Sequence, residues 1–222
     1  RRSSDLFVAE ATYGTDPTTG YVWQYAISSS LGKRVPRIVP ARLGLRPPTT
    51  QPIAVPYVDG EVAMNYSVSD AIVGVILRAF GIRTGAASPW TYTIDGSSSG
   101  YPPTTNSLCA LVDFGAKAGG THYQQVFTGL KPTQVKFEIG ADVDPKMTVA
   151  FIGRDGAVKS PVQSISAQAD SSIATPSLWS TITLGGSAWG FKSATITVDM
   201  PKTDTGRNIT GATSLQIGRA HV

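Results

Sequence analysis

Apolar and polar residues alternate along much of this chain, and the alternation predicts short β-strands. Residues 61–68 show it most clearly, with Val62 and Met64 on one face and Glu61 and Asn65 on the other. A period of two is typical of a strand with one buried face. The same pattern, or a short run of β-branched and aromatic residues, predicts strands at residues 5–13, 21–28, 90–94, 108–114, 122–128, 135–139, 147–151, 178–184 and 194–198.

Two of these strands form a predicted β-hairpin, with residues 135–139 pairing with residues 147–151 across a turn at residues 142–145. In the first strand of this hairpin, successive side chains point to opposite faces. Val135, Phe137 and Ile139 therefore face one way, and Gln134, Lys136 and Glu138 face the other.

The polar residues 157–176 predict an exposed loop of low complexity. Beyond it, residues 178–184 and 194–198 are expected to form a further pair of strands around Gly185 and Gly186.

One segment follows a helical period instead. In residues 71–80, apolar side chains recur at spacings of three and four. Ser69 is a good N-cap, Asp70 suits the start of the helix dipole, and Gly81 can end the helix. The many Val and Ile residues leave a strand as the alternative, but the cap and the length of the run favour a helix.

Residues 28–58 differ from the rest of the chain, because they contain six prolines and five cations but no Asp or Glu. Proline removes donors that a helix or a central strand needs, so we expect a long extended arm. The arm holds more apolar residues than a solvated linker would, which indicates packing on its own domain or on a neighbouring copy. The candidate self-assembly residues are Lys33, Arg34, Arg37, Ile38, Arg42, Leu43 and Arg46.

The basic part of this arm raises nucleic-acid binding as an alternative, because Lys and Arg contact phosphates. The segment has no interleaved aromatic residues for base stacking, and the net charge of the whole chain is only +4. We expect these cations to be solvated or to pair with acidic residues of a neighbouring subunit.

Composition agrees with a β-rich protein. Only 15% of residues are charged, and there are 23 glycines and 15 prolines, which disfavours a helical bundle. The predicted fold class is all-β: a β-sandwich or partly open barrel with one flanking α-helix and a long extended arm. A single domain is expected over residues 1–216. Residues 217–222 resemble the translation of a sequencing adapter, so we expect them to be non-native and the domain to be truncated there. We expect no signal peptide and no membrane association.

The sequence offers little catalytic chemistry. Residues 96–100 match the GxSxG pattern of serine hydrolases, but that pattern needs a following helix, and Pro102 and Pro103 prevent one. The single cysteine, Cys109, fits a small core residue. His122 is expected at the surface or in an interface. A serine hydrolase therefore remains only a distant alternative.

Three aspartates, at 142, 144 and 155, are candidate cation ligands. No calcium-loop pattern surrounds them, and Asp in tight turns bonds its own backbone. We therefore predict no catalytic residue, no metal site and no cofactor.

Several segments, taken in order, resemble a known family. The start, Phe7 to Pro17 (FVAEATYGTDP), the strand-to-helix passage SVSDAIVGVILRAFGI at residues 67–82, and the stretch YQQVFTGLKPTQVKFEIGADVDPKMTVAFIGRDG at residues 123–156 are similar to tail tube proteins of long-tailed bacteriophages.

The resemblance implies a non-enzymatic virion protein with a small β-sandwich and a flanking helix. Six copies would form a ring, and rings would stack into the tail tube through which the genome is ejected. Its partners would be further copies of itself, other tail proteins, and DNA that passes through the lumen without specific binding. Assembly would take place in the bacterial host cytoplasm. Gln134, Lys136 and Glu138 are the candidate lumen-facing residues, and we expect the arm cations to lie outside the channel.

The main alternative is a β-sandwich binding module, of the adhesin or carbohydrate-binding type. It would need exposed aromatic side chains along one face. The candidates are Trp23, Trp90, Trp179 and Trp189.

Overall fold

The computed structural model describes eleven stretches of the chain, residues 4–35, 56–65, 71–80, 82–84, 91–93, 107–116, 122–140, 143–163, 182–184, 187–189 and 193–199. Several predicted features lie outside the described residues. They are Arg37, Ile38, Arg42, Leu43 and Arg46 of the arm, the GxSxG segment at 96–100, Asp142, and residues 217–222.

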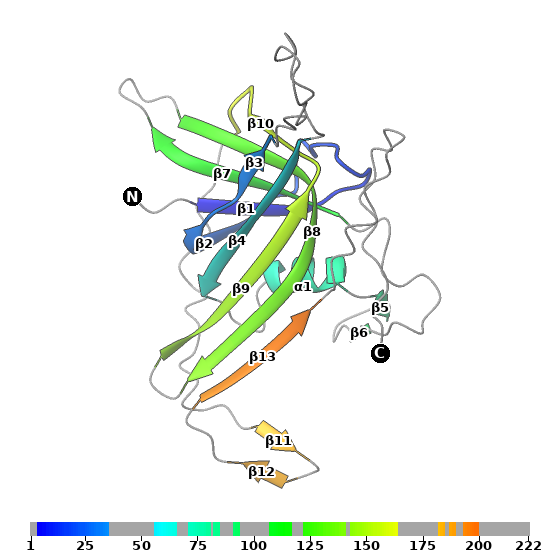
Figure 1. Cartoon of the computed structure of the whole chain (residues 1–222), viewed down its shortest axis with the longest axis vertical. Helices are drawn as coiled ribbons and strands as arrows, with labels where there is room; N and C mark the ends of the chain where they lie inside the picture. The colour runs from blue at the N-terminus through cyan, green and yellow to red at the C-terminus, as the bar shows by residue number, and fades with distance from the viewer. Residues whose placement is uncertain are drawn as a thin grey trace, which may run out of the picture.

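The described part of the chain is strand-dominated with one α-helix (Figure 1), which confirms the predicted all-β class. The helix is α1 (Ala71–Phe80), as the apolar spacing predicted. The strands are β1 (Ser4–Ala9), β2 (Val22–Ser29), β3 (Gly32–Arg34), β4 (Tyr57–Asn65), β5 (Ile82–Thr84), β6 (Thr91–Thr93), β7 (Leu108–Ala116), β8 (His122–Gly140), β9 (Val143–Gly153), β10 (Asp155–Val158), β11 (Ile182–Leu184), β12 (Ser187–Trp189) and β13 (Ser193–Asp199).

Six of these strands form a circuit of antiparallel pairs. β1 pairs with β2 and β7, β7 with β8, β8 with β9, β9 with β4, and β4 with β2. β7 pairs with the first part of β8, and β9 pairs with the second part. The ring of strand pairs is therefore not closed along its whole length. Together with β3, β10 and β13, these strands make one nine-stranded antiparallel sheet that is largely open.

β8 is one strand of 19 residues, although the sequence predicted two separate strands at 122–128 and 135–139. Gly129 has a φ of +66°, which is easy for glycine but strained for other residues. A register shift follows between Pro132 and Gln134. The glycine and the proline, which read as a break in the sequence, instead bend a continuous strand between two sets of partners.

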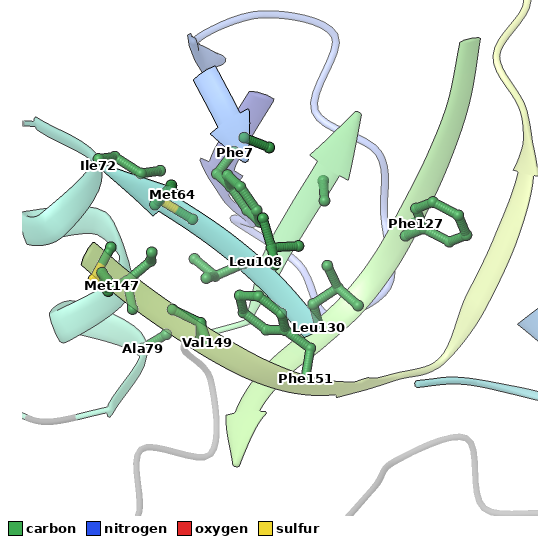
Figure 2. Close-up of a cluster of buried hydrophobic side chains, with 14 of the residues drawn as sticks. Phe7, Met64, Ile72, Ala79, Leu108, Phe127, Leu130, Met147, Val149 and Phe151 are labelled. Carbon is green, nitrogen blue, oxygen red and sulfur yellow. The ribbon is translucent and has the colours of Figure 1, made fainter. Parts of the chain in front are cut away.

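The main core is formed by strands of this sheet and is closed by α1. Ile72 and Ile76 of α1 are fully buried, and the helix packs against β1, β2 and β8. Figure 2 shows side chains from α1, β4 and β9 meeting in one cluster. Within it, the rings of Phe7 and Phe151 stack with centroids 5.7 Å apart. A smaller apolar cluster on the other face of β1 and β7 contains Leu6, Val8, Cys109, Leu111 and Val126.

Two other predictions about chain organisation are wrong. Residues 193–199 pair with the second half of β8, not with residues 178–184, while β11 pairs with the nearby β12. Residues 157 and 158 belong to β10, which continues beside β8 after β9, so the predicted loop begins later.

The predicted arm at residues 28–58 is also shorter than expected, because its ends are part of the sheet. Residues 28 and 29 end β2, residues 32–34 form β3, and residues 57 and 58 begin β4. β3 is a short strand beside β4, so the few residues before Pro36 can pair before the prolines intervene.

Candidate functional site

The strands β4, β9, β8 and β13 lie side by side (Figure 1), and their registers give them one shared polar face. Residues that are directly opposite each other in paired antiparallel strands share a face of the sheet. The strand registers therefore arrange twelve residues in three rows, which we call the polar face. The rows are Glu61, Ala150, Gln134 and Asp199; Ala63, Thr148, Lys136 and Thr197; and Asn65, Lys146, Glu138 and Thr195.

The opposite face of the same strands belongs to the core. Val62, Val135 and Val149 are at most 1% exposed. Because alternate residues of a strand point to opposite faces, burial of these three fixes the outward direction of the twelve. Among the twelve residues of the polar face, Ala63 is the one that is buried.

Three charged side chains of the polar face, Lys136, Lys146 and Glu138, are in contact. The Lys136 ammonium donates to Oε1 of Glu138 at 2.7 Å, and the Lys146 Nζ lies 3.6 Å from Oε2 of the same carboxylate. The hydrogen bond from Lys136, together with the nearby positive charges of Lys136 and Lys146, holds the pKa of Glu138 below its ordinary value. In the next strand pair, Nε2 of Gln134 donates to Oδ1 of Asp199 at 2.6 Å.

The face as a whole is close to neutral. It carries two lysines and three acidic residues, Glu61, Glu138 and Asp199. The remaining members are amides, threonines and alanines, so the surface offers hydrogen bonds without an excess of cations.

The structure brings Gln134, Lys136 and Glu138 together on this face, as the alternation in the hairpin predicted. Val135 is buried, and Phe137 packs against the main core from the other side of the strand. That these residues face a channel stays a prediction.

The two described cations of the arm lie elsewhere and have partners in their own chain. Lys33 pairs with Asp155 at 2.6 Å, and Nε of Arg34 donates to Asp59 at 2.7 Å. The expectation that the arm cations are solvated or pair with acidic residues of a neighbouring subunit stays a prediction.

A buried carboxylate that the sequence did not single out holds the bend of β8. Glu10 accepts hydrogen bonds from Ser107 Oγ at 2.5 Å, from the Gly14 N–H at 2.8 Å and from the Gly129 N–H at 2.7 Å. Burial raises the pKa of Glu10, although these bonds oppose the shift. The sequence signal was a lone Glu directly after an apolar strand. Its role is positional, because the three donors belong to the ends and bends of other elements.

The other candidate residues, Cys109 and His122, contact side chains of their own chain. Cys109 is fully buried, as predicted, and burial raises its pKa to about 12, so the thiol is a poor nucleophile. Tyr21 contacts it at 3.2 Å and donates to Asp16, which also pairs with Lys159. His122 is half exposed and lies 2.8 Å from the buried Asp113.

Asp144 is exposed and Asp155 pairs with Lys33. Among the described residues, no group of three or more His, Cys, Asp or Glu is placed to hold a metal ion. No helix in that same part of the chain is long and apolar enough to span a membrane. Trp90 and Trp179, two of the four tryptophans on which the binding-module alternative depends, lie outside the described residues.

The described part of the chain is thus strand-dominated, and its polar face is an exposed sheet surface. The chain belongs to a family of structural tail components of bacteriophages: the family model described as "Phage tail tube protein" matches residues 1–222. A comparison with curated proteins gave no match.

Among solved structures, the chain is similar to one in the cryo-EM structure of the anti-feeding prophage baseplate, determined with sixfold symmetrisation. The two are 7% identical, and the match covers 71% of this chain and 92% of that chain with a TM-score of 0.42.

Proposed function

We propose that this chain is the repeating subunit of a tail tube, in which hexameric rings stack into the conduit for genome ejection and the polar face lines the channel. The observation that carries the proposal is the polar face itself. It is a nearly neutral wall of three rows across four strands, in a chain of the tail tube family. The partners are further copies, other tail proteins and the passing DNA.

A channel for DNA needs a wall that does not bind it. Each contact between a cation and a phosphate adds affinity and would slow the moving polymer. Lys136 and Lys146 are both in contact with Glu138, and the other side chains of the polar face are neutral or acidic. This face suits a polymer that slides past, which supports its place in the channel.

One edge of the same sheet is available for assembly. Within the described strands, β13 pairs with β8 alone. Its sequence, SATITVD, contains no proline and no lysine, which are the usual means of blocking an edge. A strand from a neighbouring copy on this edge would extend the polar face from one subunit to the next. A contact of this head-to-tail kind closes into a ring when the rotation allows it.

Site-specific labelling tests where the polar face lies in the assembled tube. Cys109 is fully buried, so an introduced surface cysteine is the preferred site for a gold maleimide. We would label the exposed Thr197 as Thr197→Cys and, as a matched control, Val158→Cys on β10, which is 59% exposed and outside the polar face. Each labelled protein would be assembled and averaged by cryo-EM.

The expected result is gold density on the channel side of the wall for Thr197→Cys and at a different position for Val158→Cys. Gold from Thr197→Cys on the outer surface would contradict the channel assignment. A full-length protein that stays monomeric at high concentration, in both light scattering and images, would contradict the assembly itself.

A further inference from the structure

Glu138 occupies a distinctive place on the polar face, because its two oxygens contact two different lysines. Oε1 accepts from Lys136, which lies two residues away on β8, and Oε2 faces Lys146, its cross-strand neighbour on β9. In the described part of the chain, no other carboxylate lies within ion-pair distance of either lysine. A single carboxylate, with one negative charge, is therefore the counter-charge that both cations share.

Folding does not explain this arrangement. The three side chains are between 35% and 42% exposed, and exposed ion pairs typically contribute little to stability. Val135 and Met147, on the other face of the same two strands, are almost fully buried and hold the strands together. The charge of Glu138 therefore has a larger effect on the electric field at the polar face than on the stability of the sheet.

We propose that Glu138 keeps this face from gripping duplex DNA, by engaging two lysines that would otherwise bind backbone phosphates and by halving their net charge. The partner is the phosphate backbone of a DNA duplex, and recognition is independent of base sequence. The inference rests on the proposed function in one respect, that DNA is the polymer that meets this face. It goes beyond that function in assigning the low affinity of the wall to one carboxylate.

The expected size of the effect follows from counterion release. Each phosphate neutralised by a lysine adds about 0.9 to the slope of log K against log salt concentration. With both lysines released, the slope steepens by about 1.8, so between about 50 and 200 mM salt the affinity falls by an additional factor of about 12.

The experiment measures binding of a short fluorescent DNA duplex to the full-length protein by anisotropy over a range of salt concentrations. Glu138→Gln removes the carboxylate charge with little change in shape. The matched control is Asp144→Asn, since Asp144 is exposed on β9 and, by alternation with Lys146, points the same way, while the ion pairs of these two lysines among the described residues are with Glu138. A triple variant, Lys136→Gln with Glu138→Gln and Lys146→Gln, removes the released cations.

The proposal expects tighter, more salt-dependent binding for Glu138→Gln and the wild-type slope for Asp144→Asn. The triple variant should not bind more tightly than wild type. Equal slopes for Glu138→Gln and Asp144→Asn would overturn the proposal, as would enhanced binding that persists in the triple variant. DNA binding is measured on unassembled protein, so its result is independent of the gold labelling. The gold labelling can contradict the channel assignment while the Glu138→Gln variant still binds DNA more tightly. The channel assignment can also hold while Glu138→Gln leaves DNA binding unchanged.

Discussion

The first and second halves of β8 are parts of one strand in two different environments. From residue 126 to residue 133, every residue is buried, whichever face it points to. From residue 134 to residue 139, only Val135 is fully buried and its neighbours are partly exposed. The difference comes from what covers the outward face of each half.

In the first half, side chains of the smaller apolar cluster and the segment around Gln163 lie over the side that would otherwise face solvent. Polar groups buried there are paired. Gln124 is 1% exposed and bonds to Asp113 and to the backbone of Gln163 at both its carbonyl and its N–H. In the second half, β9 and β13 complete a sheet whose outward side carries the polar face.

The comparison separates two roles within a single strand. The first half is an anchor in which both faces contribute to stability, and the second half contributes stability from one face and leaves the other free for function. Substitutions along β8 should therefore have large effects on folding before the bend and small ones after it on the outward side.

The largest expected effect is the loss of an aromatic ring from the anchor. Phe127 is 2% exposed, and its ring fills the space beside Gly156. Phe127→Ala should reduce the free energy of unfolding by about 3–5 kcal/mol, the usual cost of removing a buried ring. Phe137→Ala, in the partly exposed half, should cost less than half as much. Urea unfolding of both variants measures the difference, and equal losses would show that the two halves are equally part of the core.

The second expected effect concerns Glu10, which holds the bend. Glu10→Ala leaves the Ser107 hydroxyl and the N–H groups of Gly14 and Gly129 without their acceptor. A buried donor without a partner costs about 1–3 kcal/mol, so we expect a loss of about 2–3 kcal/mol at neutral pH, because the backbone can adjust.

The pH dependence of this loss has a definite sign. Burial raises the pKa of Glu10 above its usual value of 4.5, so the folded state holds the proton more tightly than the unfolded chain. The stability that this contributes is fully present below about pH 4.5 and is lost as the pH rises through the folded pKa. The gap between wild type and Glu10→Ala should therefore be wider at about pH 4 than at pH 7. A gap that widens towards neutral pH would mean that the hydrogen bonds outweigh the cost of burial.

The sequence predicted the second half of β8 better than the first for a physical reason. Alternation appears only where one face is buried, and Val135, Phe137 and Glu138 follow it. In the first half both faces are buried, so no period marks the strand, and Gly129 and Pro132 read as its end. The helix at 71–80 was predictable because its own residues carry the cap and the period.

Long-range pairing could not be predicted from local pattern. The partner of residues 193–199 is β8, more than fifty residues away in the chain, and the nearer candidate at 178–184 pairs with β12 instead. The contacts of Glu138 with two lysines also depend on the register between β8 and β9, which the sequence gives only as a hairpin. The sequence predicted to which face of the sheet a side chain points, but it did not predict which side chains are in contact on that face.

The smallest expected effect comes from a pair of glutamines, one in each half. Gln134 donates to Asp199 on the exposed side of the sheet, where water can replace the bond, so Gln134→Ala should change the free energy of unfolding by less than about 0.5 kcal/mol. The same change at Gln124 removes one of the partners of the buried Asp113 and both bonds to the Gln163 backbone and should cost about 2 kcal/mol. Thermal and urea unfolding of the two variants, which delete the same side chain from the same strand, test the contrast directly. A loss at Gln134 as large as that at Gln124 would mean that the polar face is built for stability, and the assignment of that face to a sliding surface would lose its physical basis.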